Sequence, residues 1–384
     1  MRYGAFRTLS VTAALCFSVA ADPALAGPIE TLQPGMWYQV PNSHLSAVLP
    51  SPLPPGLSGP GSIIGAWSGG AYDTKRDRLL VWGGGHADYG GNEIYAFDMN
   101  GLSWSRIWGP SANIPAPGGS AVDTYSDGNP VSRHTYDGLE YLPSTDQFWI
   151  NGGSRYCGSG SAGRDTWVFD FASSQWVQKA NLPVCDGCAY LEQATGFDPV
   201  TGHIWLVQAG TELMEYDPST NAWTKRGGSA IGSDKAGAID WKRRRFVVIG
   251  GGSSFYYDIS QSGTVSRQAL DTTGATGIIG TRYPGIAYDP VSDRMVAWNG
   301  GADIYLLNMD TLVWTKQTTT GSVIPTSGAS AGTYGRFQYV PSKNVFVVVN
   351  GIDEDVYIYR LSAGGTPPPT DSSAPAAITD LRPR

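Results

Sequence analysis

Histidine, arginine and tyrosine side chains, which together can perform acid–base chemistry on an anionic ligand, recur in short segments of this sequence. His86 lies in the glycine-rich segment GGGHADYGGN, Arg133 and His134 open the segment RHTY, and Arg282 precedes a tyrosine. Arginine binds a carboxylate through two parallel hydrogen bonds, histidine can accept a proton near neutral pH, and tyrosine can donate one. β-Elimination at a uronate needs these three roles: neutralisation of the carboxylate, removal of the C5 proton and protonation of the leaving oxygen.

Whether these side chains meet depends on an internal repeat that runs through most of the chain. Each copy has an aromatic or apolar residue, a polar turn, a β-rich run and a glycine, as in GAYDTKRDRLLVWGGG (70–85) and GIAYDPVSDRMVAWNGG (285–301). The aromatic or apolar register positions are Tyr72, Tyr141, Phe197, Ile239, Tyr288 and Tyr339. Twelve residues after each of these, without a gap, stand Gly84, Gly153, Ala209, Gly251, Gly300 and Gly351.

Each copy predicts two strands joined by a tight turn that contains Asp, Pro, Ser and Lys or Arg. A third strand with alternating aromatics follows, and in four copies a tryptophan opens a fourth strand: Trp104, Trp176, Trp223 and Trp314. Four antiparallel strands repeated around an axis form the blades of a β-propeller. The sixth copy lacks the tryptophan strand, but residues 35–40 (GMWYQV) resemble residues 102–107 (LSWSRI). We therefore predict an all-β, six-bladed propeller over residues 35–362, whose last blade is completed by an N-terminal strand.

These residues resemble the kelch-repeat family: paired glycines end the second strand, an aromatic-rich strand follows, and a spaced tryptophan comes next. The resemblance covers about residues 35–362 and implies a kelch-type propeller, the fold that galactose oxidase also has. The fourth copy departs from the pattern, because Thr264 stands where the tryptophan is expected. Propellers host both binding proteins and enzymes, so the resemblance predicts the fold and leaves the function open.

Propeller geometry predicts that two sets of residues share one face near the axis. Five positions before the register stand Trp67, Tyr136, Glu192, Asp234, Tyr283 and Tyr334. Near these or just after the glycines come His86, Arg133, His134, Arg155, Arg282 and Arg336. We predict His86 or His134 as the base and Tyr136 or Tyr283 as the acid. The predicted substrate-binding residues are Arg133, Arg155, Glu192, Arg282, Tyr334 and Arg336, with Arg282 or Arg336 on the carboxylate.

Each of these residues also has a purely structural interpretation. The arginines could pair with Glu192, Asp234 and Asp353 and fasten the loops. His86 could be a turn histidine bonded to backbone or could be oriented by Asp88, and His134 could be a packed loop residue. The tyrosines could simply line the central channel. The sequence does not distinguish these alternatives.

Composition and the termini indicate an exported protein. Residues 1–26 have a basic start, an apolar run and the small-x-small site Ala24-Leu25-Ala26, as in a cleaved signal peptide. Secreted or periplasmic localisation is therefore expected, and no later segment is apolar enough to span a membrane. The net charge of -7 disfavours a nucleic-acid-binding surface.

Two further features concern the cysteines and the C-terminal end. An oxidising compartment permits a disulfide among Cys157, Cys185 and Cys188, in a pairing that the sequence leaves open. Residues 363–375 are rich in Pro, Gly, Ser and Thr and predict a linker. Residues 376–384 resemble the start of a fibronectin type III module that is cut short.

Two functional hypotheses follow. In the first, the protein is a polysaccharide lyase that acts on an acidic, uronate-containing glycan; its His, Tyr and Arg inventory resembles that of propeller lyases such as the seven-bladed ulvan lyases. In the second, it is a non-catalytic propeller that binds a glycan or a protein outside the cytoplasm. Galactose oxidase and sialidase activities are disfavoured, because the adjacent Tyr-His pair of the first and the Asp-box turns of the second are missing. No cofactor or metal is predicted, and a monomer is expected.

Overall fold

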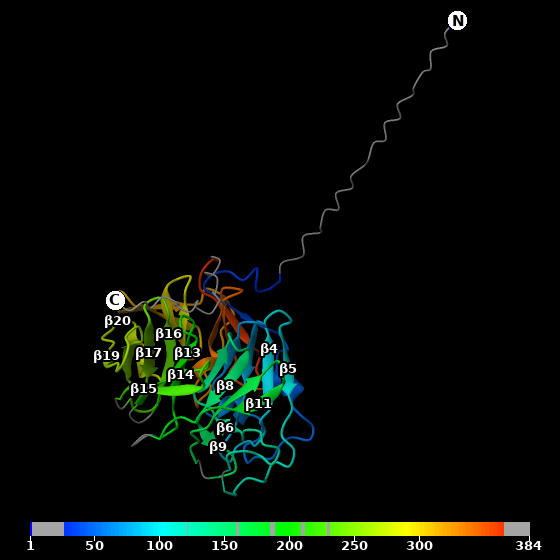
Figure 1. The fold of residues 1–384 in the computed structure, drawn as a ribbon. Helices are drawn as coiled ribbons and strands as arrows, with labels where there is room; N and C mark the ends of the chain where they lie inside the picture. The colour runs from blue at the N-terminus through cyan, green and yellow to red at the C-terminus, as the bar shows by residue number, and fades with distance from the viewer. Residues whose placement is uncertain are drawn as a thin grey trace.

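The protein forms six β-sheets of four or five strands, which are arranged as blades around a common axis (Figure 1). The computed structural model describes Met1 and residues 27–364, apart from residues 121, 159–160, 185–188, 209–211 and 229–230. Within each blade the four main strands pair antiparallel, and they follow one another along the chain except that β1 joins the last blade and pairs with β27. The predicted all-β, six-bladed propeller is confirmed.

The first three blades follow one another in chain order, each from its inner to its outer strand. Blade 1 contains β2 (Ala71–Asp73), β3 (Arg78–Val81), β4 (Ile94–Asp98) and β5 (Ser103–Trp108). Blade 2 contains β7 (Leu139–Leu142), β8 (Gln147–Asn151), β10 (Thr166–Asp170) and β11 (Gln175–Gln178). Blade 3 contains β12 (Ala194–Asp198), β13 (His203–Val207), β14 (Glu212–Asp217) and β15 (Ala222–Gly228).

The other three blades complete the ring. Blade 4 contains β16 (Ala236–Asp240), β17 (Arg245–Gly250), β18 (Ser253–Asp258) and β19 (Arg267–Ala269). Blade 5 contains β21 (Gly285–Asp289), β22 (Arg294–Trp298), β23 (Asp303–Asn308) and β24 (Val313–Thr318), with β20 (Thr273–Gly274) added at its edge. Blade 6 contains β25 (Gln338–Val340), β26 (Val345–Val348), β27 (Tyr357–Arg360) and β1 (Met36–Gln39).

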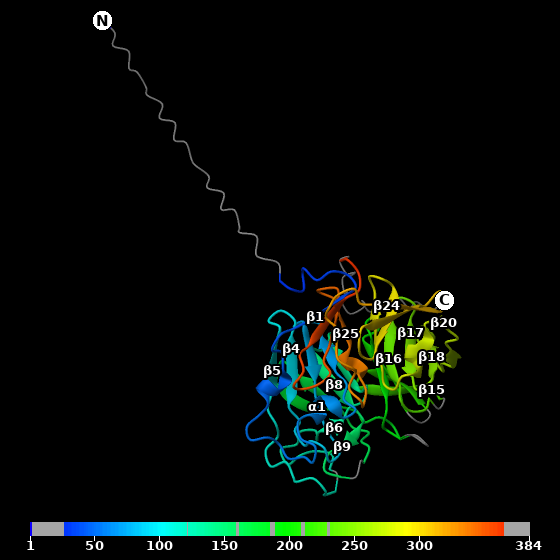
Figure 2. The ribbon, with the colours of Figure 1, turned by 180° about the vertical axis from the view of Figure 1, so that it is seen from behind.

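The remaining elements are short. They are the two-stranded sheet of β6 (Arg133–His134) and β9 (Ser154–Arg155), the helix α1 (Ser62–Gly65), and the 3₁₀ turns η1 (Leu45–Val48), η2 (Thr276–Gly280) and η3 (Tyr334–Arg336). In Figures 1 and 2 the β6–β9 sheet lies at the lower end of the propeller, among the long loops of blades 1 and 2. The described chain begins and ends near the opposite end. No helix among the described residues is long and apolar enough to cross a membrane.

The N-terminal strand closes the ring as predicted. Met36 pairs with Arg360, and Trp37 pairs with Tyr359, so β1 becomes the outer strand of blade 6. The ring of Trp37 also lies 5.5 Å from that of Trp298 in blade 5. Trp82 and Trp176 make the corresponding contact between blades 1 and 2 at 5.5 Å. The outer-strand tryptophans therefore join neighbouring blades, and their large apolar area stabilises the ring.

Blade 4 differs from the others where its sequence departs from the repeat. Its outer strand β19 has three exposed residues and begins at Arg267, beyond Thr264. The chain then continues along the edge of blade 5, where β20 runs parallel to β24 and pairs Thr273 with Val313. Blade 4 has no outer-strand tryptophan to bury against the preceding blade, and its fourth strand is short.

The turn between the first two strands has the same backbone in every blade. Its fifth residue after the register position has a left-handed backbone in all six copies: Asp77, Asp146, Gly202, Arg244, Asp293 and Asn344. Asp, Asn and Gly tolerate this conformation best, which explains their frequency here. In blades 2 and 5 the register tyrosine also donates a hydrogen bond to this residue, from Tyr141 to Asp146 at 2.9 Å and from Tyr288 to Asp293 at 2.8 Å.

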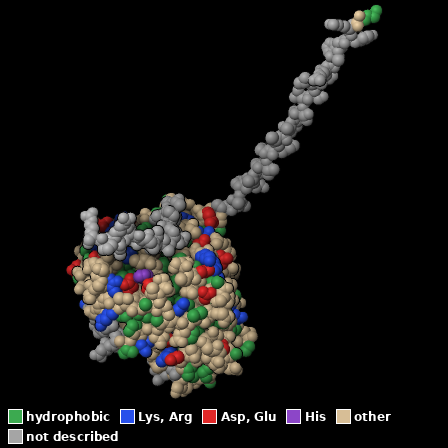
Figure 3. Space-filling model, viewed as in Figure 1, with side chains coloured by type: hydrophobic (Ala, Val, Ile, Leu, Met, Phe, Trp, Pro, Cys, Tyr) green, Lys and Arg blue, Asp and Glu red, His purple; other side chains and the backbone are tan. Residues whose placement is uncertain are grey.

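The turns between the first and second strands of the blades lie at one end of the propeller, which we call the turn end. Ion pairs at the turn end join neighbouring blades. Arg243 of blade 4 binds Asp293 of blade 5 through two hydrogen bonds of 2.7 and 2.8 Å, and it also binds the fully buried Asp240 at 3.0 Å. Arg76 of blade 1 makes the same paired contact with Asp146 of blade 2. Hydrogen bonds from these arginines hold the pKa of Asp146 and of Asp293 well below the ordinary range. Over the rest of the face seen in Figure 3, acidic and basic side chains are interspersed.

Several predicted segments lie outside the described residues. These are the predicted signal peptide (1–26), most of the predicted linker (363–375) and the fibronectin-like residues (376–384). Cys185 and Cys188 also lie outside them. Cys157 is a buried free thiol, whose Sγ lies 3.2 Å from the carbonyl oxygen of Ala116. The disulfide stays a prediction.

Replacing Arg243 should loosen the junction between blades 4 and 5. Arg243→Met leaves the buried Asp240 without its cation, and we expect the free energy of unfolding to fall by about 3 kcal/mol. Because the pKa of Asp293 is depressed in the folded state, its contribution is present above the unfolded pKa of about 3.9 and is lost as pH falls. When urea unfolding is measured at neutral and at acid pH, the free energy of unfolding should therefore fall less between the two in Arg243→Met than in the unchanged protein.

Arg294→Met provides the control, since Arg294, which follows Asp293 in the turn of blade 5, binds only backbone carbonyls among the described residues. Two results would show that the paired contact does not join the blades. One is an equal loss of unfolding free energy in the two variants. The other is a fall of unfolding free energy toward acid pH that is as large in Arg243→Met as in the unchanged protein.

Candidate functional site

The residue at the entrance to each first strand has a left-handed backbone in all six blades. These residues are Trp67, Tyr136, Glu192, Asp234, Tyr283 and Tyr334, with φ between 46° and 69°. We call them the axial ring. Bulky side chains rarely adopt this conformation, and each instance costs on the order of 1–3 kcal/mol. Such strain is typical of positions where a side chain must point in a fixed direction for function.

The axial ring converges through its tyrosines. The ring of Tyr334 lies 4.9 Å from that of Tyr283 and 6.3 Å from that of Tyr136, which belong to blades 5 and 2. The backbone of neighbouring members also touches: Tyr136 N donates to Trp67 O at 2.6 Å, and Tyr283 N donates to Asp234 O at 3.1 Å. The buried hydroxyl of Tyr334 has no hydrogen-bond partner within the described residues. The sequence offset thus correctly placed these residues together at one end of the propeller.

A histidine–aspartate pair stands beside the axial ring. Nε2 of His134 lies 2.9 Å from Oδ2 of Asp88, and Ser58 donates to the other oxygen of Asp88 at 2.6 Å. A carboxylate only accepts hydrogen bonds, so the neutral imidazole carries its proton on Nε2 and keeps a lone pair on Nδ1. Burial lowers the pKa of His134, although the hydrogen bond with Asp88 opposes this shift. His134 is therefore neutral at neutral pH.

His86 lies next to this pair but does not share its carboxylate. Its half-buried imidazole stacks on that of His134 with ring centres 5.5 Å apart. Of the two alternatives for His86, the one in which Asp88 orients its imidazole is not what the structure shows, because Asp88 bonds to His134 instead. His86 itself has a left-handed backbone, with φ of 49°.

The opposite side of the ring is acidic and carries one exposed arginine. Tyr283 donates a hydrogen bond of 3.1 Å to Glu192, and burial raises the pKa of Glu192 above its ordinary value. Arg282 binds Asp234 with two contacts of 3.0 Å and lies over the ring of Tyr283 at 5.2 Å. Its side chain is 67% exposed. Two of the five guanidinium N–H groups thus face Asp234 and a third faces the hydroxyl of Tyr283 at 3.4 Å, which leaves the other two available to a ligand.

The tyrosines of the ring are held as neutral phenols. Burial raises the pKa of Tyr136, and Glu192 raises it further. Burial also raises the pKa of Tyr283, with hydrogen bonds to carboxylates as further causes. A phenol with a raised pKa can donate a proton in the transition state but does not supply a tyrosinate base near neutral pH.

The other predicted arginines are buried or half-buried and have partners within the protein. Arg133 is buried and binds Asp165 through contacts of 3.1 and 2.9 Å. Arg155 pairs with Asp123, which fastens the long crossing from blade 1 to blade 2. The fully buried guanidinium of Arg336 donates to the carbonyls of Gly332 and Val349.

Burial lowers the pKa of Arg336 to about 10, and its buried Nη1 has no partner among the described residues. The substrate-binding role of Arg133, Arg155 and Arg336 stays a prediction. The contacts that the structure gives these three side chains are structural ones.

Two charged residues at the axis escaped the sequence analysis. Asp137 follows Tyr136 and is buried, and its carboxylate accepts hydrogen bonds from the backbone of Gly237, Thr195 and Gly335. Burial raises the pKa of Asp137 to about 8, although these amides oppose the shift. Lys235 is also buried, donates to Gly250 O at 2.6 Å, and has a pKa lowered by burial. In the sequence, the only indication of their location is that each directly follows a residue of the axial ring.

The residues around the axial ring do not form a metal centre. Within the part of the chain that the structure describes, no three His, Cys, Asp or Glu side chains come together in a way that could hold a metal ion.

Comparison with known proteins identifies the fold. No family model matches the chain, and no curated protein resembles it in sequence. Many solved structures do match, among them that of YjhT, with a TM-score of 0.51 and 13% sequence identity. This match covers 79% of the present chain and 94% of YjhT. The protein is a six-bladed β-propeller. At this identity the similarity concerns the fold alone, and membership of the kelch family stays a prediction.

Removing the carboxylate beside His134 should change how that histidine titrates. Asp88 raises the pKa of His134 against the effect of burial, so Asp88→Asn should lower this pKa further below its ordinary value of about 6.5. NMR titration of the imidazole signals would measure the shift. His203 is the internal control, because its pKa is raised by Glu215 on the outer part of blade 3 and should not move. An unchanged or higher pKa of His134 would contradict the assignment of the pair.

The strain of the axial ring can be tested at Trp67, its most exposed aromatic member. Glycine adopts a left-handed backbone without steric cost, whereas alanine does not. Trp67→Gly and Trp67→Ala remove nearly the same contacts, so we expect the glycine variant to be the more stable by about 1 kcal/mol. Urea unfolding would compare the two. A less stable glycine variant would show that the position is not strained.

Proposed function

We propose that this protein is a kelch-type propeller that acts outside the cytoplasm on an acidic, uronate-containing glycan, which it cleaves by β-elimination at the axial ring. The observation that carries the proposal is the neutral His134, which is bonded to Asp88 and lies beside Tyr136. Localisation rests on the signal-like residues 1–26 and kelch membership on the repeat pattern.

The base of the reaction would be one of the two stacked histidines. With its proton on Nε2, His134 has a lone pair on Nδ1 that can take the C5 proton of a uronate. His86 is the more exposed of the two and is the alternative base. The positive charge that develops on the imidazole would be stabilised by the carboxylate of Asp88.

Arg282 and a tyrosine would complete the chemistry. Arg282 would bind the uronate carboxylate with the N–H groups that Asp234 leaves available, which makes the C5 proton more acidic. As this proton leaves, the electron pair of the C5–H bond forms the C4–C5 double bond, and the bond from C4 to the glycosidic oxygen breaks. That oxygen takes the proton of Tyr136 or Tyr283, both of which are held neutral by burial.

Binding without cleavage is the second candidate, and one observation favours it. Arg282 connects to His134 through the rings of Tyr283, Tyr334 and Tyr136, in contacts of 5.2, 4.9, 6.3 and 6.4 Å. A series of aromatic and charged groups of this length suits a ligand of several sugar units. It does not require that one unit touch both Arg282 and a histidine.

A spectroscopic assay separates these candidates. The mature protein is incubated with a panel of uronate-containing polysaccharides while the ultraviolet absorbance of the unsaturated product is recorded. We expect the absorbance to rise with the unchanged protein. The rate of this rise should fall by at least about 100-fold in whichever of His86→Ala and His134→Asn removes the base. The rise should also be lost in Arg282→Ala. His203→Ala and Arg294→Ala serve as matched controls away from the axial ring. A flat trace with glycan binding that survives the histidine changes would exclude the lyase and leave the binding propeller.

A further inference from the structure

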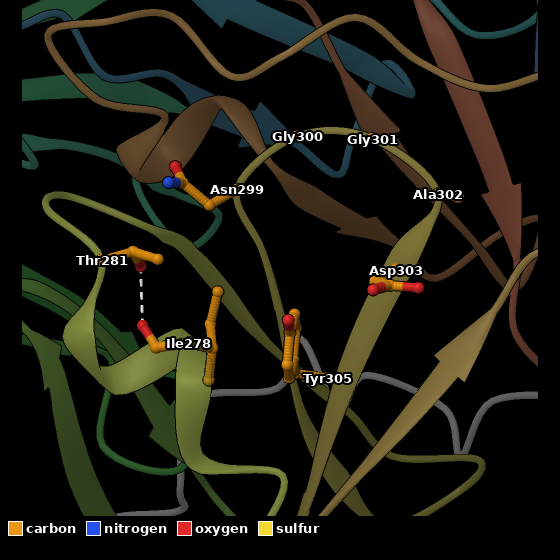
Figure 4. A pocket seen from close by; sticks show the side chains of 8 residues that line it. All are labelled: Ile278, Thr281, Asn299, Gly300, Gly301, Ala302, Asp303 and Tyr305. Atoms are coloured by element: carbon orange, nitrogen blue, oxygen red, sulfur yellow. Dashed lines mark hydrogen bonds between the residues drawn. The ribbon is translucent and has the colours of Figure 1, made fainter.

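A cavity of about 290 Å³ lies between blades 4 and 5 (Figure 4). Its walls are η2 with Thr281 on one side and the loop that follows β22 on the other. Thr281, which lines the cavity, immediately precedes Arg282 in the chain. The volume of the cavity is close to the lower end of the roughly 300–1,000 Å³ of ligand pockets.

One wall of the cavity is apolar and another is bare backbone. Ile278 and the half-buried ring of Tyr305 form the apolar wall, and Gly300, Gly301 and Ala302 form the loop opposite (Figure 4). Gly300 and Gly301 have φ of 108° and 69°, and a Cβ on Gly301 would meet nothing within 4 Å. Glycines allow a ligand to approach the backbone closely here.

Some polar groups of the cavity already have hydrogen-bond partners within the protein, and others do not. The hydroxyl of Thr281 is donated to Ile278 O at 2.6 Å, and Asp303 is bound by Lys316 at 2.8 Å and Thr318 at 2.6 Å. The amide Nδ2 of Asn299 and the hydroxyl of Tyr305 make no hydrogen bond to the described residues. The lining contains a carboxylate and no Lys, Arg or His side chain.

From these observations we propose that the cavity binds an uncharged sugar unit adjoining the uronate held by Arg282. The substrate class would then be a heteroglycan in which a uronate neighbours a neutral or N-acetylated sugar. This inference rests on the proposed function of the axial ring. It adds a second subsite, between blades 4 and 5, whose chemistry differs from that of the first.

The electrostatics of the cavity explain this choice of occupant. A second uronate in the cavity would bring its carboxylate near Asp303, whose cationic partner Lys316 lies outside the lining, and no cation of the lining would bind it. An uncharged sugar presents an apolar ring face to Tyr305 and Ile278. Its hydroxyls can pair with Asn299 and with the hydroxyl of Tyr305, so that no buried polar group is left unpaired.

The experiment compares two unsulfated oligosaccharides of equal length by isothermal titration calorimetry. In one probe uronate alternates with an uncharged N-acetylhexosamine, and the other is a homo-oligomer of uronate. We expect the alternating probe to bind at least about tenfold more tightly. Ala302→Trp, which fills the cavity, should remove this difference by weakening only the alternating probe. Ala302→Ser is the matched control.

A second pair of variants guards against misfolding of the filled cavity. Tyr305→Ala removes the apolar wall and should also weaken only the alternating probe. Tyr256→Ala is its control, because both tyrosines are half-buried and pack against the same core while only Tyr305 lines the cavity. Thermal unfolding confirms that each variant is folded.

The outcomes distinguish this inference from the function on which it rests. If the homo-oligomer binds at least as tightly as the alternating probe in an Arg282-dependent way, or if neither Ala302→Trp nor Tyr305→Ala weakens the alternating probe, the neutral subsite is excluded while the uronate site stands. If neither probe binds, or if Arg282→Ala weakens neither, the proposed function fails and the subsite with it.

Discussion

A single buried carboxylate at the axis connects four of the six blades. Asp137 precedes the first strand of blade 2, and the backbone amides that bind it belong to blades 3, 4 and 6. Burial raises the pKa of this group to about 8, so its neutral form predominates at neutral pH. Tyr136 is its immediate neighbour, so the position of the axial ring depends on this contact.

The two ends of the propeller use the same backbone conformation for different purposes. At the turn end, left-handed positions are mostly Asp, Asn and Gly, which adopt it at little cost, and Arg76 and Arg243 lock neighbouring blades there. At the axial end, the left-handed positions hold tryptophan, tyrosine, glutamate and aspartate. Bulky residues also adopt this backbone at the turn end, at Leu102, Arg244 and Leu312. What distinguishes the axial end is that bulky or charged residues occupy all six equivalent positions there, and that the side chains of the tyrosines among them converge.

The repeat spacing was sufficient to predict much of this architecture. Because each blade has the same length between the ring position and the turn, the offsets in the sequence identified the axial ring and the closing strand β1. Side-chain partners were not predictable in this way. Arg133 binds Asp165 and His134 binds Asp88 because loops of blades 1 and 2 pass close together in space, which a periodic pattern does not encode. The cavity lined by Thr281 likewise depends on η2, a short helical turn that the strand repeat did not predict.

The closing strand also determines the order in which the molecule can fold. Met36 and Arg360 are paired although they lie more than 300 residues apart in the sequence, so β1 has no native neighbour until the final blade exists. A loop of this length makes closure entropically costly and slow. Five blades can pair internally beforehand, but until β1 is in place blade 6 leaves the edge of β27 open, and open edges promote association with other chains. The pairing of β1 with β27 therefore makes the whole ring one cooperative unit. In this unit β1 is the first strand to be synthesised and among the last to form its hydrogen bonds.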